Sequence, residues 1–115
     1  MSPENWKNAI CDVVEQISNE RFQRTAWFGL DPNVVSSPDE LFCTLLDDFI
    51  FDDFLTSPEV NLTSKQRAAG QDLKNKLEKF AASVPGQLDP RQVIDDERWR
   101  EIRLAAQAFR QKLMS

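Results

Sequence analysis

Histidine is absent from the 115 residues of this chain. Its absence removes the commonest acid–base side chain, the nucleophile–histidine arrangements and most zinc sites. Neither a Gly-rich phosphate-binding loop nor a G-x-S-x-G pattern occurs. An enzyme built from this sequence would have to rely on carboxylates, lysine or cysteine alone. We therefore expect a protein that is not an enzyme, with no catalytic residues, no metal site and no cofactor.

Glycine is scarce, at three residues, and no segment shows a clear alternating strand pattern. Apolar residues recur instead at helical spacing in four segments, near 3–19, 38–50, 64–83 and 96–113. The sequence therefore predicts an all-α fold: a single-domain bundle of four main helices over 1–115, with short helical turns between them. The expected core consists of Trp6, Ile10, Ile17, Phe42, Leu45, Phe49, Leu73, Leu77, Phe80, Trp99, Ile102 and Phe109.

Each main helix has a recognisable start signal. Ser2-Pro3 and Ser37-Pro38 place a capping hydroxyl before a proline at the first helical position. Thr63 and Gln66 have the spacing of a capping box, and Asp95 or Asp96 is expected to cap the last helix. Pro85-Gly86 should end the third helix, and Gly70 inside it would permit a close approach between helices.

The chain contains two cysteines, Cys11 and Cys43, which form no C-x-x-C pattern. Both stand beside apolar stripes, so we expect reduced, buried thiols that contribute packing and no chemistry. The first residues lack a basic and apolar leader, and no apolar run reaches the length of a membrane span. These features favour a cytoplasmic protein that does not associate with membranes.

The segment 47–55 (DDFIFDDFL) contains more apolar residues than one narrow helical stripe accommodates. Two interpretations fit it. Either the helix is buried on most sides, or it breaks near Phe51 and restarts with Asp52 or Asp53 as the cap. We favour the break.

Lysine and arginine are absent from the forty residues between Arg24 and Lys65. Eight acids lie there; taking them from the chain's 19 leaves 11 acids against 14 bases elsewhere, a net charge of +3 outside the segment. Paired aspartates at 47–48 and 52–53 repel one another unless folding brings bases to them, although they also solubilise an apolar segment. The acids are Asp31, Asp39, Glu40, Asp47, Asp48, Asp52, Asp53 and Glu59.

A concentrated negative surface suits three roles: docking a basic protein, binding a hard cation, or acid–base catalysis. The segment lacks the ligand spacing of an EF-hand loop and has no companion nucleophile, so docking is the least demanding of the three. Direct binding of nucleic acid is disfavoured, because acids repel phosphate. The predicted partner-binding residues are Asp47, Asp48, Asp52 and Asp53, with Asp39 and Glu40 at the rim and Phe51 and Phe54 as aromatic companions.

The stretch WFGL…SSPDELFCTLLDDFIFDDFL…LTSKQ, with the later P…DP…VIDDERWREIR…A…F, resembles small bacterial immunity proteins encoded beside contact-dependent growth-inhibition toxins. The resemblance covers roughly 27–109 and consists of helix starts and acid–aromatic segments, without an invariant chemical motif. It implies a cytoplasmic protein that binds the toxin domain of its own system, one to one, and occludes the toxin's active site. Such toxins are often nucleases with basic surfaces, which the acidic segment would suit. The alternative is a non-catalytic helical adaptor or regulatory domain that binds another basic protein.

Overall fold

The computed structural model describes residues 2–84, 86 and 88–114. These residues form helices and, within the described part of the chain, no strand, which confirms the all-α fold class. In chain order the elements are α1 (Pro3–Ser18), α2 (Glu20–Trp27), α3 (Pro38–Cys43), the π-helix η1 (Thr44–Asp48), α4 (Phe51–Thr56), α5 (Ser64–Ser83), α6 (Pro90–Asp95) and α7 (Glu97–Met114).

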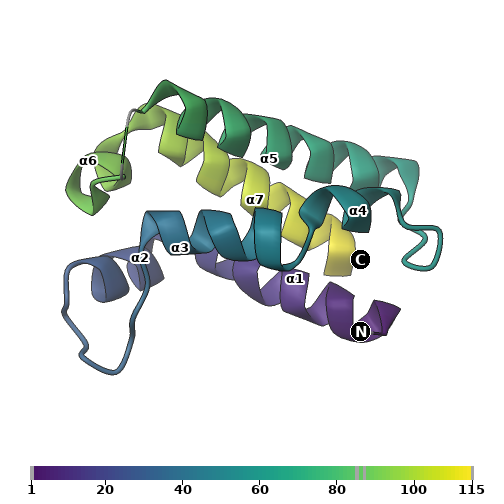
Figure 1. Ribbon diagram of the computed structural model, residues 1–115, viewed down its shortest axis with the longest axis horizontal. Helices are drawn as coiled ribbons and strands as arrows, with labels where there is room; N and C mark the ends of the chain where they lie inside the picture. The colour runs from purple at the N-terminus through teal and green to yellow at the C-terminus, as the bar shows by residue number, and fades with distance from the viewer. Residues whose placement is uncertain (1, 85, 87, 115) are drawn as a thin grey trace.

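Three long helices form the frame, and α7 is the one that contacts both of the others. α5 and α7 run in opposite directions, and α1 packs against α7 from the other side (Figure 1). A front layer of α3, η1 and α4 lies across this frame, while α2 and α6 lie at the end opposite the chain termini (Figure 1). Residues from all three parts contribute to one hydrophobic core.

The structure confirms the predicted helix starts. Each capping side chain accepts a hydrogen bond from a backbone N–H no more than three residues further along the chain. The hydroxyls of Ser2 and Ser37 accept from the backbone N–H groups of Asn5 (3.1 Å) and Glu40 (3.0 Å). Thr63 and Gln66 form the reciprocal capping box. The carboxylate of Asp96 accepts from the Arg98 N–H at 2.8 Å at the start of α7.

The first helix ends at Ser18, one residue before the predicted end near 19. Asn19 adopts an extended conformation, and its side chain accepts from the Phe22 N–H at 3.0 Å, so the same residue ends α1 and caps α2. α2 then runs to Trp27. Pro85, expected just after α5, lies outside the described residues.

The predicted core is confirmed except at Trp6 and Phe49, which are half-buried and pack against the edge of the core. The expectation of two buried thiols is wrong for Cys43, which is exposed on α3. Cys11 is half-buried, and burial raises the pKa of its thiol. Helical periodicity placed both thiols beside apolar stripes, but it did not show that Cys43 is exposed to solvent.

Gly70 confirms the expected close approach. A Cβ at this position would meet Leu55 Cδ2 on α4 and would lie 2.9 Å from Phe109 Cε1 on α7. Both neighbours are fully buried, so the front layer and α7 pack directly against the α5 backbone here. Among the helices of the described residues, none combines the length and the apolar character needed to cross a membrane.

Candidate functional site: an acidic corner in the front layer

The front layer turns sharply at Ile50, between η1 and α4. The Phe49 N–H donates to the Thr44 carbonyl at 2.9 Å, which is the five-residue bond of a π-helix, and α4 begins at Phe51. The break favoured from the sequence is therefore confirmed, one residue before Phe51. The expected caps are wrong, because no side chain caps α4 and its N-cap residue is Ile50 itself.

Ile50 adopts the left-handed conformation, with φ 48° and ψ 61°. This conformation costs an L-residue about 1–2 kcal/mol, and a branched Cβ makes it less favourable still. The turn points Phe51, Phe54 and Leu55 into the core and leaves the Ile50 side chain 50% exposed. The corner thus combines backbone strain with an exposed apolar side chain, a combination often found where a protein meets a ligand.

Trp6 on α1 fixes both sides of this corner. Its indole Nε1 donates to the Phe49 carbonyl at 2.7 Å, at the end of η1. Its ring also packs edge-on against Phe54 of α4, with ring centroids 5.4 Å apart. The corner is therefore held by a long-range contact.

The predicted aromatic companions Phe51 and Phe54 are not accessible to a partner. Both are fully buried, and Phe51 packs edge-on against Phe109 of α7 at 5.5 Å between ring centroids. The turn at Ile50 rotates these rings inward, which the sequence pattern could not show. The apolar side chains that the corner exposes are Ile50 and, in part, Phe49 and Trp6.

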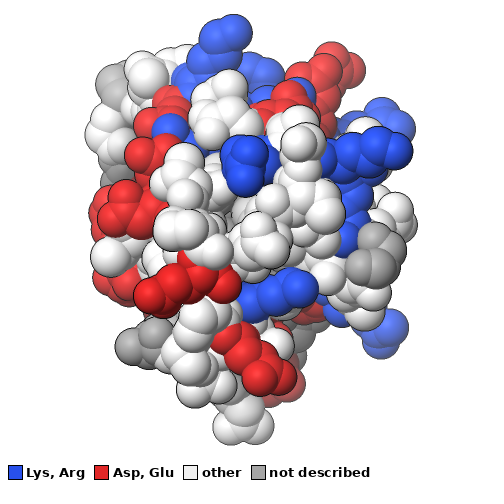
Figure 2. Space-filling model, turned by 90° about the vertical axis from the view of Figure 1, so that its right-hand side faces the viewer, with Lys and Arg blue, Asp and Glu red and all other residues white. Residues whose placement is uncertain are grey.

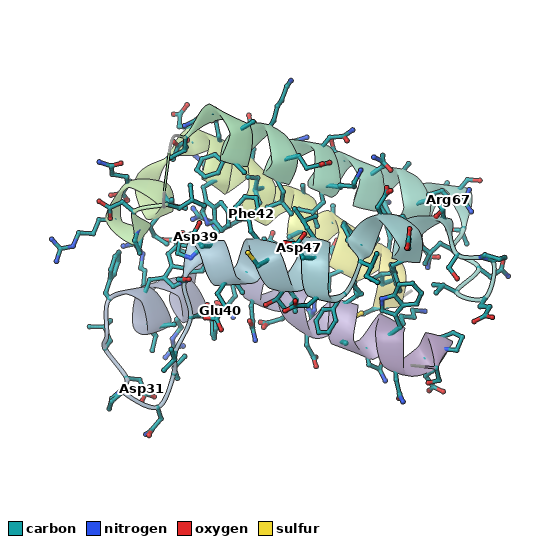
Figure 3. All side chains as sticks on the ribbon, viewed as in Figure 1. Asp31, Asp39, Glu40, Phe42, Asp47 and Arg67 are labelled. Atoms are coloured by element: carbon teal, nitrogen blue, oxygen red, sulfur yellow. The ribbon has the colours of Figure 1, made fainter. Side chains whose placement is uncertain are left out.

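The predicted binding acids all belong to the front layer, but they fall into two groups. Four of these six acids are exposed and make no ion pair with a described residue: Glu40, Asp47, Asp48 and Asp53. We call these four residues together with Ile50 the acidic face. Figure 3 shows Glu40 and Asp47 at opposite ends of the α3–η1 segment, so the face extends along the layer.

The other two acids have partners inside the fold. Asp52 accepts from the Lys74 ammonium on α5 at 3.2 Å, and Lys74 also contacts Glu78 at 3.2 Å. These two carboxylates raise the pKa of Lys74. Asp39 accepts from the Leu88 backbone N–H at 3.2 Å, which ties the segment before α6 to α3. Folding thus relieves the charge repulsion at Asp52, and Asp39 helps to hold α3 to the segment before α6.

Charge is unevenly distributed over the surface. In Figure 2, acidic residues gather along the left-hand edge, which belongs to the side that faces the viewer in Figure 1. Lysine and arginine lie mainly towards the top and the right of that view. The negative pole expected from the sequence therefore persists after folding.

A small hollow of about 230 Å³ lies at the corner and is lined by Trp6, Asp48, Phe49 and Ile50. A larger one, of about 660 Å³, lies between α2 and α6. The larger hollow is charge-balanced, because its lining includes two arginines and two aspartates: Arg24, Arg91, Asp89 and Asp95. Of the two, only the corner hollow has an acidic lining without a base.

The described residues contain no group of three or more cysteines or carboxylates placed to hold a metal ion. Comparisons of the chain with protein-family models, with curated proteins and with solved structures gave no match in any of the three.

Proposed function

We propose that this protein is a non-catalytic inhibitor that docks a basic protein surface through the acidic face. The observation that carries the proposal is the acidic face: four exposed carboxylates that make no ion pair with a described residue, together with the strained and exposed Ile50. Carboxylates that have no base nearby lower the stability of the fold, because they repel one another. A cationic partner therefore explains their presence better than a role in folding does.

The resemblance to immunity proteins gives the partner a chemical class. A nuclease-type toxin domain carries lysine and arginine where it holds its RNA or DNA, and a negative face placed there would exclude the nucleic acid. Complementary charge would raise the association rate by roughly 10–10³-fold, while an apolar contact such as Ile50 would slow dissociation. The alternative is an adaptor that presents the same acidic face to a basic protein that is not a toxin.

The experiment requires the toxin domain encoded next to this reading frame, purified with the parent protein and two variants. Asp48→Lys with Asp53→Lys reverses two acids of the acidic face. Glu97→Lys with Glu101→Lys makes the same change of net charge on α7, where both residues are exposed. Association rates are measured at two salt concentrations, and protection is measured in cells that express the toxin.

We expect the variant of the acidic face to associate at least about 10-fold more slowly, with a weaker salt dependence and reduced protection. The α7 variant should behave like the parent. If both variants associate equally slowly, net charge and not the acidic face determines the association rate. If the variant of the acidic face associates as fast as the parent, the interface lies elsewhere. A neighbouring gene that encodes no toxin would favour the adaptor.

A further inference from the structure

The hollow at the corner has the lining of a site for one cationic side chain. Three of its four lining residues are apolar, Trp6, Phe49 and Ile50, and the fourth is the carboxylate of Asp48. Arginine and lysine combine an apolar stem with a charged head, so they match a hollow that offers apolar walls and a single acid.

The walls of the hollow are fixed before any ligand arrives. The Trp6 N–H and the Phe49 carbonyl satisfy each other at 2.7 Å, and Phe54 holds the Trp6 ring edge-on from inside the core. The indole N–H therefore has its partner inside the fold, and Trp6 forms one wall of the hollow. A cation above an aromatic face gains roughly 0.5–1 kcal/mol at an exposed site.

The carboxylate of Asp48 is available. It makes no ion pair in the described part of the chain, and no lysine or arginine lines the hollow. Lys7 follows Trp6 directly in the sequence, but it does not line the hollow. Lys74 is already shared by Asp52 and Glu78.

We propose that this hollow receives one arginine side chain of the docked partner, with the guanidinium paired to Asp48 and its flat face against the aromatic wall. Arginine fits better than lysine, because its planar group can stack on a ring and form two hydrogen bonds to one carboxylate. The inference rests on the proposed function in one respect, that the arginine belongs to a basic protein.

The site can be tested without the partner, using N-acetyl-arginine-amide as the probe on the full chain. The three tryptophan indole N–H signals in a nitrogen-15 correlation spectrum report separate places: Trp6 lines the hollow, whereas Trp27 and Trp99 lie at the α2–α7 contact. We expect a saturable shift of the Trp6 signal at constant ionic strength and no shift of the other two. The neutral analogue N-acetyl-citrulline-amide should give no saturable shift, and the lysine analogue should bind more weakly than arginine.

Two matched variants separate the hollow from general negative charge. Asp48→Asn should weaken arginine binding by about 3-fold or more, whereas Asp53→Asn, with the same loss of charge on α4 outside the lining, should leave it unchanged. An unchanged Trp99 signal will show that both variants are folded. Absence of a saturable Trp6 shift, equal binding of citrulline, or equal weakening by both variants would overturn the assignment.

The two proposals can fail independently. If arginine does not bind but reversal of Asp48 and Asp53 still slows partner association, docking stands and the arginine site is wrong. If arginine binds as described but the same reversal leaves association unchanged, the hollow is a cation site and the proposed docking function is wrong.

Discussion

The indole N–H of Trp99 donates a hydrogen bond to the side-chain carbonyl of Gln23, with 3.0 Å between Nε1 and Oε1 across 76 positions of sequence. Both residues are fully buried. The amide nitrogen of Gln23 in turn donates to the carbonyls of Gln16 and Ile17, at 2.9 Å and 2.7 Å, at the end of α1. One buried side chain therefore joins the α1–α2 bend to the central helix α7.

Replacing Gln23 with leucine should lower the free energy of unfolding by about 2–4 kcal/mol. The variant keeps the volume but leaves the Trp99 N–H and the end of α1 without partners in an apolar site, where each unsatisfied group costs about 1–3 kcal/mol. Urea unfolding followed by circular dichroism measures the change. The control is Gln107→Leu, which removes the exposed bond to the Ser18 carbonyl and should cost less than about 1 kcal/mol. Equal losses in the two variants would contradict a special role for Gln23.

Gly70→Ala should destabilise the protein, although alanine is the better helix former by about 1 kcal/mol. The added methyl group would overlap Leu55 and Phe109, which are fully buried and cannot move without disturbing the core. Overpacking of this kind costs about 1–3 kcal/mol, so we expect a net loss of about 1 kcal/mol in urea unfolding. Leu55→Ala combined with Gly70→Ala should show favourable coupling in a double-mutant cycle. Increased stability of Gly70→Ala would mean that the three helices do not meet as described.

At position 50, glycine should be more stable than alanine by about 1 kcal/mol, because only glycine adopts the left-handed conformation without a penalty. Both variants, Ile50→Gly and Ile50→Ala, lack the isoleucine side chain, so the difference between their free energies of unfolding reports the backbone conformation at position 50. The exposed helical residue Ala68 on α5 serves as the control, where Ala68→Gly should lower stability by about 1 kcal/mol. The same order at both positions, with alanine the more stable, would show that Ile50 is not strained.

Stability should fall in acid partly because of Glu20. The hydrogen bond from Arg24 and the charge of the largely buried Arg103, whose Nη2 lies 3.3 Å from Glu20, lower the pKa of this carboxyl. Because the folded pKa lies below the ordinary value of about 4.3, the stabilisation is complete above that pH and is lost as pH falls through the folded pKa.

Glu20→Gln should therefore cost up to about 1 kcal/mol near neutral pH and almost nothing well below the ordinary glutamate pKa, where the parent's Glu20 is protonated as well. The effect is small because solvent screens the Glu20 side chain, which is 45% exposed. Urea unfolding of both proteins at the two pH values tests this, with Glu59→Gln as the control for a change of one charge at an exposed position. A loss that is equal at both pH values would rule out the ion pair as its cause.

The sequence showed the acidic segment, but it did not show which of its acids have partners inside the fold and which are free. Eight acids without a nearby base identified 25–64 as the negative part of the chain. Whether an acid is free depends on residues far along the chain: Lys74 reaches Asp52, and the Leu88 N–H reaches Asp39. The exposed partner of the acids also changed, from Phe51 and Phe54 to Ile50, because a single left-handed residue reverses which side chains face the core.

The sequence by itself determined the helices and their starts, because caps such as Ser37 and the Thr63–Gln66 box act within three residues of chain. Helical periodicity likewise determined most of the core, because residues such as Leu73, Leu77 and Phe109 lie on apolar helix faces that are stable only when they are buried. Tertiary structure alone decided the conformation of Ile50 and the burial of Gln23. Both are locally unfavourable, one through strain and the other through desolvation, and each persists because a tryptophan distant in sequence stabilises it. Trp6 holds the corner next to Ile50 through the Phe49 carbonyl, and Trp99 satisfies the Gln23 amide.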